Sequence, residues 1–587
     1  MDFSDRPWVS SYAPDVPRAF EVPAGSLPDL LEDSVRTYRR MVALEFFGAS
    51  TTYGDLGRAV AQSAEGLRSL GVTAGDRVAL VLPNCPQHVI AFYAVLRLGA
   101  VVVEHNPLYT DRELRHQFED HGAEVAIVWD KVAPRIQRLP EDIPVTSIVA
   151  VDLIGAMPLG RRIARRLPVP RARAARRALT PGGRSTGSRR TLSWRELLRP
   201  RPLSPRHGRP APPGTAVPQY TSGTTGVPQG AVPTHRNLLA NAAQGRAWVP
   251  GLEAGRETVY AVLPMFHAYG LTLCLSFAMS IGAKLVLFPR FDVDLVLDAM
   301  RKSPPTFLPA VPPIYERLAA GAAKRGVGLR SIRFAISGAM NLPHSTVETW
   351  EAATGGYLIE GYGLTETSPV AAGNPIGSTR RPGTVGVPFP GTDIRIVDPE
   401  DPTTDRGRGE AGELLIRGPQ VFQGYWRKPD ETRAALLDGG WFRTGDIVTA
   451  DAECFLTIVD RIKELIITGG FNVAPTEVED ALRAHPDVAD AAVVGLPGAG
   501  GGEEVTAVVV LAGGAVLDAD ALRLHCRARL AAYKVPRAIT QIDELPRSQL
   551  GKVLRREVRE QLLLAGGDRS SLPGSGQKAG RGDPRPV

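Results

Sequence analysis

A regular alternation of helix-like and strand-like stretches limits what this chain can fold into. After Thr52, the helical spacing of "YGDLGRAVAQSAEGLRSLGV" leads into the apolar run "DRVALVLPN" and then the helical "QHVIAFYAVLRLGA". The pattern continues through "VVVEHNP", "ELRHQFEDHG" and "AEVAIVW", and it returns at "ETVYAVLPMFH", "AKLVLFP" and "SIRFAISGAM". Strands that alternate with helices are typical of a parallel sheet covered by helices. The sequence therefore predicts an α/β protein.

Several domains are expected, because 587 residues are too many for one core. We predict an N-terminal domain at 1–459, with an arginine- and proline-rich linker or surface insertion at about 157–213. Strand- and turn-rich sequence from about Pro382 to Ala450 predicts a small β subdomain within it. A compact pattern of strands and helices predicts a C-terminal domain at 460–563, and Gly- and Pro-rich composition predicts a disordered tail at 564–587.

The basic charge of the chain is concentrated in that insertion. Between Arg161 and Pro210 there are sixteen arginines and one acid, Glu196, a local charge of +15 against +7 for the whole chain. One interpretation is a solvated surface insertion. A second is peripheral contact with an anionic membrane surface, which attracts basic residues. We expect no nucleic-acid partner, because no aromatic residues alternate with the arginines and no binding-fold signature lies beside them.

Other features exclude several classes of protein. The four cysteines, Cys85, Cys274, Cys454 and Cys526, lie far apart, so neither a disulfide framework nor a zinc site is indicated. The polar, acidic start "MDFSDRPWVSSY" argues against a secretory signal peptide, and we expect a cytoplasmic protein. Serines, threonine, glycines and Lys284 interrupt the most apolar run, Ala268 to Phe288. We interpret it as a buried helix followed by a buried strand rather than a membrane span.

A short loop, "YTSGTTGVPQGAV" from Tyr220 to Val232, is rich in glycine and hydroxyl groups. Its hydroxyls and closely approaching backbone N–H groups are suited to holding an anion. It is not a Walker A loop, because the GK[ST] ending is absent. By itself the loop could equally be a flexible surface turn.

Five further motifs accompany the loop: "LPMFHAYG", "YLIEGYGLTETSP", "WFRTGDI", "DRIKELIITGGFNVAPTEVE" and "LPRSQLGKVLRRE". In this order and spacing they resemble the core motifs of the adenylate-forming superfamily, which includes acyl- and aryl-CoA synthetases, luciferases and adenylation domains. The resemblance covers about Ser26 to Glu560. It implies a large N-terminal domain, made of two α/β subdomains and a small β-barrel-like subdomain, followed by a small, mobile α+β C-terminal domain.

The resemblance also implies ATP and Mg²⁺ as cofactors and an acyl-adenylate intermediate. Forming that intermediate brings a carboxylate and a phosphate together, so positive charge is needed where they meet. The matching catalytic residues are Lys552, Thr365 and Glu366, with Glu366 also the expected Mg²⁺ ligand. The residues expected to bind ATP are Thr221, Ser222, Gly223, Thr224, Thr225, Gly226, Gly338, Ala339, Gly361, Tyr362, Asp446 and Arg461.

A second set of positions matches the thioester-forming half of the reaction in this family. Lys463 corresponds to a hinge about which the C-terminal domain turns between the two half-reactions. Gly469 and Gly470 would border the passage for the thiol of CoA, the co-substrate. His267 would lie near the entrance for the acid; as a lone histidine it would instead be a packed core residue.

Two positions depart from the family pattern. Gln229 stands where the loop usually has a lysine, so we expect weaker ATP binding through loss of a charge-assisted contact. In "SGAMNLP" a glycine and an Ala-Pro pair are replaced, which predicts a pocket of different shape on the adenine or acyl side.

The substrate is predicted from weaker signals. "RPWVSSYAPDVP", "SLPDLLEDSVRTY" and "PLGRRIARRLP" resemble bacterial long-chain fatty-acid–CoA ligases. The leading hypothesis is therefore an ATP-dependent acyl-CoA synthetase acting on a medium- to long-chain fatty acid or another carboxylic acid. The alternatives are an acyl- or aryl-AMP ligase that loads a carrier protein, and a catalytically weakened homologue that binds nucleotide or acyl groups.

Overall fold

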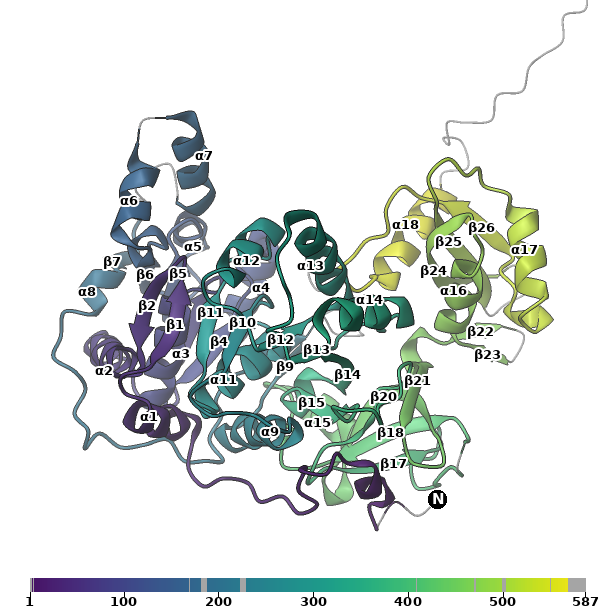
Figure 1. Cartoon of the computed structure of the whole chain (residues 1–587), viewed down its shortest axis with the longest axis horizontal. Coiled ribbons are helices and arrows are strands. Elements are labelled where there is room, and N and C mark those ends of the chain that lie inside the picture. The colour runs from purple at the N-terminus through teal and green to yellow at the C-terminus, as the bar shows by residue number, and fades with distance from the viewer. Residues whose placement is uncertain are drawn as a thin grey trace, which may run out of the picture. The chain divides into compact units, whose positions relative to one another are not determined.

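The computed structural model describes residues 3, 5–167, 169–180, 187–221, 229–407, 409–468, 471–498, 503–548 and 551–567 (Figure 1). The chain divides into two compact units, and the division falls between Ile458 and Val459. It lies inside strand β21 (Leu456–Arg461). Within the described residues, no helix combines the length and the apolar character needed to cross a bilayer.

A nine-stranded sheet forms the centre of the first unit. Its order is β16-β15-β14-β13-β12-β10-β11-β1-β2. The six strands from β14 to β1 run parallel, and β15, β16 and β2 add antiparallel edges. The bounds are Val387–Pro388 (β16), Val370–Gly373 (β15), Tyr357–Gly363 (β14), Phe334–Ser337 (β13), Phe307–Ala310 (β12), Thr258–Ala261 (β10), Lys284–Leu287 (β11), Val42–Phe46 (β1) and Ala49–Thr52 (β2).

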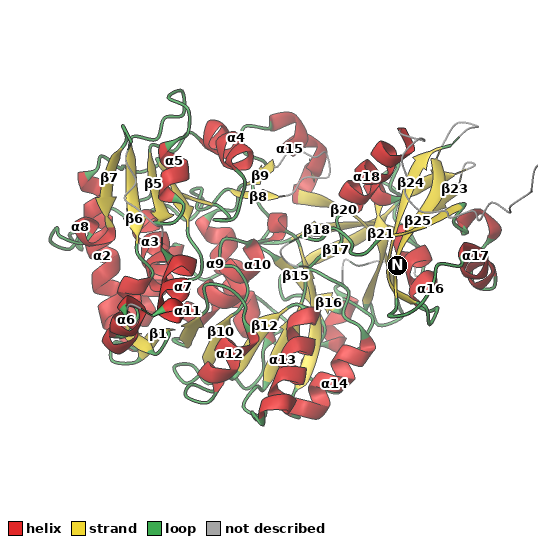
Figure 2. Ribbon diagram, turned by 90° about the horizontal axis from the view of Figure 1, so that it is seen from above, coloured by secondary structure: helices red, strands yellow, loops and turns green. Residues whose placement is uncertain are grey.

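Helices cover both faces of this sheet (Figures 1 and 2). On one face lie α12 (Val293–Met300), α13 (Pro312–Arg325) and α14 (His344–Thr354). On the other lie α9 (His235–Trp248), α10 (Ala268–Gly270), the π-helical turn η3 (Leu271–Ser276) and α11 (Phe277–Ser280). The buried helical turns from Ala268, followed by strand β11, match the interpretation of the apolar run as core.

A second, five-stranded sheet is parallel throughout, in the order β4-β3-β5-β6-β7 (Figure 2). Its strands are Val101–Glu104 (β4), Arg77–Val81 (β3), Val125–Trp129 (β5), Ser147–Val151 (β6) and Arg190–Ser193 (β7). The helices around it are α1 (Leu27–Thr37), α2 (Tyr53–Ser69), α3 (Pro86–Arg97), α4 (Asp111–His121) and α5 (Ala133–Gln137). Helix α3 is buried along its whole length because it contacts β3 and β4 of this sheet and β1 of the nine-stranded sheet. The two sheets therefore confirm the predicted α/β class.

The arginine-rich insertion contains more regular structure than the linker or surface excursion that its composition predicted. It includes α6 (Leu159–Arg166), α7 (Pro170–Leu179) and α8 (Trp194–Leu197). Strand β7 also lies within it and pairs in parallel with β6, so part of the insertion completes the second sheet. Two helical turns, η1 (Pro7–Ser11) and η2 (Ile154–Ala156), precede the insertion in the chain.

A third, mostly antiparallel sheet corresponds to the predicted β-rich stretch. It has the order β17-β18-β20-β19, and β21 also pairs with β20. The strands are Asp393–Val397 (β17), Gly412–Arg417 (β18), Leu436–Leu437 (β19) and Trp441–Ala450 (β20), with α15 (Pro429–Ala435) and the turn η5 (Asp438–Gly440) between them.

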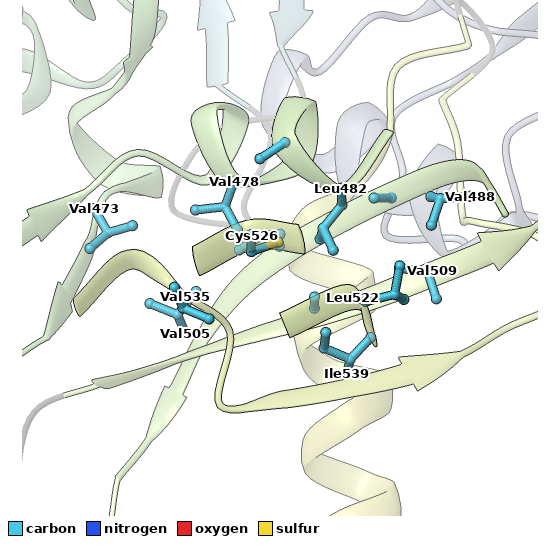
Figure 3. Close-up of a cluster of buried hydrophobic side chains, with 14 of the residues drawn as sticks. Val473, Val478, Leu482, Val488, Val505, Val509, Leu522, Cys526, Val535 and Ile539 are labelled. Atoms are coloured by element: carbon cyan, nitrogen blue, oxygen red, sulfur yellow. The ribbon is translucent and has the colours of Figure 1, made fainter. Parts of the chain in front are cut away.

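The second unit packs helices against a three-stranded sheet, β24-β25-β26. Its elements are η6 (Ile462–Glu464), β22 (Ile466–Thr468), β23 (Phe471–Val473), α16 (Pro475–Arg483), β24 (Val488–Pro497), β25 (Glu503–Leu511), α17 (Ala519–Arg527), η7 (Ala532–Lys534), β26 (Ala538–Gln541) and α18 (Arg555–Gly567). Figure 3 shows its core, where Val478 and Leu482 of α16 meet Leu522 and Cys526 of α17 over the sheet. Helix α18 continues through Gly567, so residues 564–567, predicted to begin the tail, are helical.

Candidate active site

The predicted phosphate loop connects two short antiparallel strands, β8 (Gln219–Thr221) and β9 (Gln229–Ala231). Thr221 ends β8 and is paired in register with Gln229, the residue that replaces the usual lysine. The remaining predicted loop residues, Ser222, Gly223, Thr224, Thr225 and Gly226, lie outside the described residues. The structure thus places the two ends of the loop side by side.

Both ends of this hairpin are tied to distant parts of the first unit. The Tyr220 hydroxyl donates to Asp120 Oδ2 at 2.6 Å, and burial together with that carboxylate raises the pKa of Tyr220. The Trp426 backbone N–H donates to the Gly230 carbonyl at 2.7 Å. These contacts fix the two strands on either side of the predicted phosphate loop.

Predicted adenine-pocket residues lie together at the carboxyl ends of β13 and β14. The register pairs Ser337 with Glu360, so the chain leaves both strands at the same edge of the sheet. A Cβ added at Gly338 would lie 3.2 Å from the Tyr269 ring and 3.3 Å from the Gly361 carbonyl oxygen. Ala339 follows with a left-handed φ of 66°. Ligands of open α/β sheets bind at such strand ends.

Tyr362 and Asp446 are brought into direct contact by the fold. Tyr362 lies on β14 and Asp446 on β20, 84 residues later, and the Tyr362 hydroxyl donates to Asp446 Oδ2 at 2.5 Å. Both residues are buried, with 7% and 2% of their surface exposed. The Asp446 backbone N–H donates to Thr444 Oγ1 at 3.1 Å, which fixes the backbone of β20 at this position. A ring and a carboxylate predicted to serve one nucleotide therefore share one site.

Glu366 and Thr365 lie in the turn η4 (Thr365–Thr367) that follows β14. Glu366 is 8% exposed, and its Oε1 accepts a hydrogen bond from the Tyr425 hydroxyl at 2.9 Å. Burial and the Glu366 carboxylate raise the pKa of Tyr425, so the phenol remains a donor. The donor set fits Mg²⁺, a hard cation that binds through one or two carboxylates and completes its shell with phosphate and water oxygens.

Glu360 is a buried acid beside this site that the motif analysis did not select. It is 7% exposed, and burial raises its pKa to about 8 against a backbone hydrogen bond from Leu342 that lowers it. It lies on β14 directly before Gly361 and lines a small cavity with Leu342, Asn374 and Arg380. The sequence shows it only as one letter of "YLIEGYG".

A narrow cavity with apolar walls begins beside Gly361. Its lining comes from α9, η3, α11 and the neighbouring strands and loops: Gly245, Trp248, Val249, Leu273, Phe277, Phe307, Ile336, Ile359, Gly361, Val370, Gly373 and Phe389. An apolar cavity lined by Gly361, beside the residues predicted to bind the nucleotide, is suited to a carboxylic acid with a hydrocarbon chain. None of the lining residues except Gly361 was selected from the sequence, because the cavity forms where three helical segments, the strands β12 to β15 and two loops pack together.

His267 was predicted near the acid entrance, with a packed core residue as the alternative. It is the N-cap of α10, and its Nδ1 accepts a hydrogen bond from the Tyr269 backbone N–H at 3.3 Å. The residue has exposed surface, yet burial of the imidazole lowers its pKa to about 4, so the ring is neutral at pH 7.

Two predicted residues of the second unit, Arg461 and Lys552, lie near Glu464. Burial would raise the pKa of Glu464, but Arg555, Lys552 and Arg461 together hold it below its usual range. Lys552 lies in a tight turn in which its backbone N–H donates to Ser548 Oγ at 3.2 Å. The predicted catalytic lysine is therefore positioned within its own unit. Gly469 and Gly470 lie outside the described residues.

Arg555, which sequence reasoning did not select, organises the segment around the predicted hinge Lys463. Its guanidinium donates to both carboxylate oxygens of Glu479 at 2.7 Å, to Thr476 Oγ1 at 2.8 Å and to Glu464. This bidentate pairing joins α18, α16 and η6, the turn that contains Lys463. Its only sequence signal was its place in "GKVLRRE".

Comparison with known families identifies the class of protein. The family described as AMP-binding enzyme matches residues 31–426, and the family described as AMP-binding enzyme C-terminal domain matches residues 477–552. Because the first match covers more than half of the chain, this protein belongs to the AMP-binding enzyme family, and the resemblance to adenylate-forming enzymes is confirmed.

Individual relatives narrow the class. The chain is 38% identical to a long-chain-fatty-acid–CoA ligase of Bacillus subtilis (strain 168), across 95% of this chain and 98% of that protein. The crystal structure of ATP-bound MatB from Rhodopseudomonas palustris is 30% identical, with a TM-score of 0.78 over 91% of this chain and 98% of that one. A Mycobacterium tuberculosis fatty acyl CoA synthetase is 27% identical, with a TM-score of 0.71 over 92% of this chain and 99% of that one.

Proposed function

We propose that the protein is an ATP-dependent acyl-CoA synthetase acting on long-chain fatty acids. The observation that carries this proposal is the apolar cavity that begins at Gly361, next to the Tyr362–Asp446 pair and Glu366. Similarity to long-chain-fatty-acid–CoA ligases over nearly the whole chain supports it.

In the first half-reaction, a carboxylate oxygen attacks the α-phosphorus of ATP, pyrophosphate leaves and acyl-AMP forms. Asp446 and Arg461 are proposed to bind the ribose hydroxyls, and Tyr362 with Gly338, Ala339 and Gly361 the adenine. The loop from Thr221 through Gly226 and Thr365 are proposed to hold the phosphates through hydroxyl and backbone donors. Mg²⁺ bound at Glu366 would neutralise phosphate charge.

Lys552 is proposed to supply the positive charge needed where the carboxylate meets the phosphate. A lysine about 4 Å from such a pair contributes on the order of 4 kcal/mol at an effective dielectric constant of about 20. Within the second unit, the Glu464 carboxylate interacts electrostatically with both Lys552 and Arg461. Removing the ammonium should therefore lower the adenylation rate by about a hundredfold or more.

In the second half-reaction, the thiol of CoA attacks the acyl carbonyl and AMP leaves. The proton of the thiol passes to solvent. Lys463 is proposed to be the pivot between the two half-reactions, and Gly469 and Gly470 to border the thiol passage. His267, exposed at the N-cap of α10, is proposed to lie at the entrance for the acid.

We also propose that the enzyme works in the cytoplasm at the inner face of the membrane. Long-chain fatty acids partition into bilayers, so an enzyme that meets them there has a higher local substrate concentration.

One experiment tests the reaction and the substrate class together. The purified protein is incubated with Mg-ATP, CoA and acetate, octanoate, palmitate or benzoate, and AMP and acyl-CoA are followed by mass spectrometry. We expect palmitoyl-CoA from the wild type and its loss in Lys552→Ala, while Lys324→Ala, an exposed lysine of the first unit, retains activity. Acyl-AMP without thioester would favour a carrier-protein ligase, and no turnover with any acid would favour a binding homologue.

A further inference from the structure

The arginine-rich insertion begins with a helical hairpin. Helices α6 and α7 pack on each other and stand side by side beyond the edge of the strands in Figure 1. From 157 to 180 the sequence has eight arginines, no acidic residue and no aromatic residue. The hairpin therefore carries a dense positive charge that no acid within it offsets.

Contacts at its base hold the hairpin on the first unit. The guanidinium groups of Arg161 and Arg165 lie over the Phe47 ring, 5.5 Å and 5.7 Å from its centroid. At the end of α7, the Leu179 carbonyl accepts a hydrogen bond from Trp129 Nε1 at 2.8 Å. Because Phe47 and Trp129 belong to β1–β2 and β5, the hairpin is fixed to both sheets.

The opposite side of α6 and the turn into α7 expose aliphatic side chains. Leu159 is 68% exposed and Ile163 55%, and they lie four residues apart on one face of α6. Leu167 and Val169, in the connection between the helices, are 49% and 48% exposed. A helix of a globular protein normally turns such a stripe toward the core, whereas here it faces solvent.

We infer that this hairpin docks on the surface of an anionic phospholipid bilayer. The arginines complement anionic headgroups, and the aliphatic stripe can enter the boundary between headgroups and acyl chains, as in interfacial amphipathic helices. Nucleic acid fits less well, because an aliphatic stripe without an aromatic residue offers no base-stacking surface. The surface would bring the enzyme to membranes in which long-chain acids dissolve.

Docking of the hairpin on a bilayer does not depend on the ligase chemistry. The full-length protein is mixed with sucrose-loaded vesicles of phosphatidylcholine alone or with phosphatidylglycerol, and the bound fraction is measured by sedimentation. We expect binding to the anionic vesicles that weakens as salt is raised, because exposed charges are screened. We expect little binding to the neutral vesicles.

Two variants, each with a matched control, separate the aliphatic from the cationic contribution to binding. Leu159→Ser with Ile163→Ser should lower the vesicle partition coefficient about tenfold or more. Arg173→Gln, Arg176→Gln and Arg177→Gln together should lower it about a hundredfold. The controls change exposed residues elsewhere: Leu108→Ser with Val516→Ser for the aliphatic set, and Arg36→Gln, Arg256→Gln and Arg290→Gln for the arginine set.

Circular dichroism and turnover of octanoate, a soluble acid, should be the same in hairpin variants and wild type. Any of three results would overturn the inference. The wild type does not bind anionic vesicles, the hairpin variants bind as well as the wild type, or the controls lose as much binding as the hairpin variants. Preferential binding to a DNA duplex, lost in the arginine variant, would assign the hairpin to nucleic acid instead. Vesicle binding by a protein without ligase activity would refute only the proposed reaction.

Discussion

Gly245 is the position at which the acyl cavity can be tested most directly. It lies inside helix α9 and lines the cavity. A helix-interior glycine destabilises a helix by about 1 kcal/mol relative to alanine. An added Cβ would lie 3.5 Å from Phe277 and 3.9 Å from Leu273, both ordinary contacts, so steric exclusion does not explain the glycine. We infer that the missing side chain leaves room for the acyl chain.

Gly245→Leu should therefore fill part of the cavity and select against long acids. A leucine side chain displaces about three or four methylenes, each worth about 0.8 kcal/mol when buried, so the loss is about 3 kcal/mol. That corresponds to about a hundredfold decrease in kcat/KM for palmitate. Octanoate, whose chain ends earlier, should lose less.

The assay measures kcat/KM for both acids by release of AMP, with Gly245→Ala as the matched control. Alanine should raise the thermal unfolding midpoint slightly through helix propensity and change the acid preference little. An equal loss for palmitate and octanoate in the leucine variant would refute the assignment of this cavity to the acyl chain.

Three further predictions address charge. Gln229→Lys should lower the KM for ATP severalfold by restoring a charge-assisted phosphate contact, and an unchanged KM would contradict this. Burial raises the pKa of Glu360 from 4.5 to about 8. Between these pH values the carboxyl group is protonated in the folded chain and ionised in the unfolded chain. The free energy of unfolding therefore falls as pH rises through this range. Glu360→Gln should reduce this loss of stability between pH 5 and pH 8 by about 1 kcal/mol or more. If the unfolding midpoints of the variant and the wild type change in parallel with pH, the pKa of Glu360 is not raised. Arg555→Met should destabilise the second unit by about 3 kcal/mol in urea unfolding, because the buried Glu479 carboxylate loses its bidentate guanidinium partner and is left with the more distant Arg483 at 3.8 Å. The neighbouring Arg556→Met, an exposed i,i+4 pair with Glu560, should cost less than about 1 kcal/mol, and equal effects would disprove the special role of Arg555.

Local pattern and motif order determined a large part of this protein. Continuous apolar runs such as that in "DRVALVLPN" predict buried strands of a parallel sheet, because the run itself supplies the side chains that both faces of the strand bury. The family resemblance follows from motif residues such as Lys552 and Glu366, which are recognisable within a few neighbours. The α/β class and the AMP-binding family could thus be predicted without tertiary information.

Composition did not reveal the regular structure of the insertion at 157–213. Arginine, proline and glycine predicted a linker or a surface insertion, and helices α6 and α7 and strand β7 form there. Their stability depends on partners far away in the chain, such as Phe47 under Arg161 and β6 beside β7. A local reading cannot include such partners, because tertiary packing supplies most of the stability of short helices and strands.

Only the tertiary structure decided how the site is assembled. Tyr362 and Asp446 are 84 residues apart and meet because β14 and β20 are brought together, and Arg555 reaches Glu479 across 76 residues. The apolar cavity exists only where α9, η3 and the nine-stranded sheet leave space between them. A sequence specifies which residues are available for chemistry, whereas the distances between them are set by the packing of elements whose contacts are non-local.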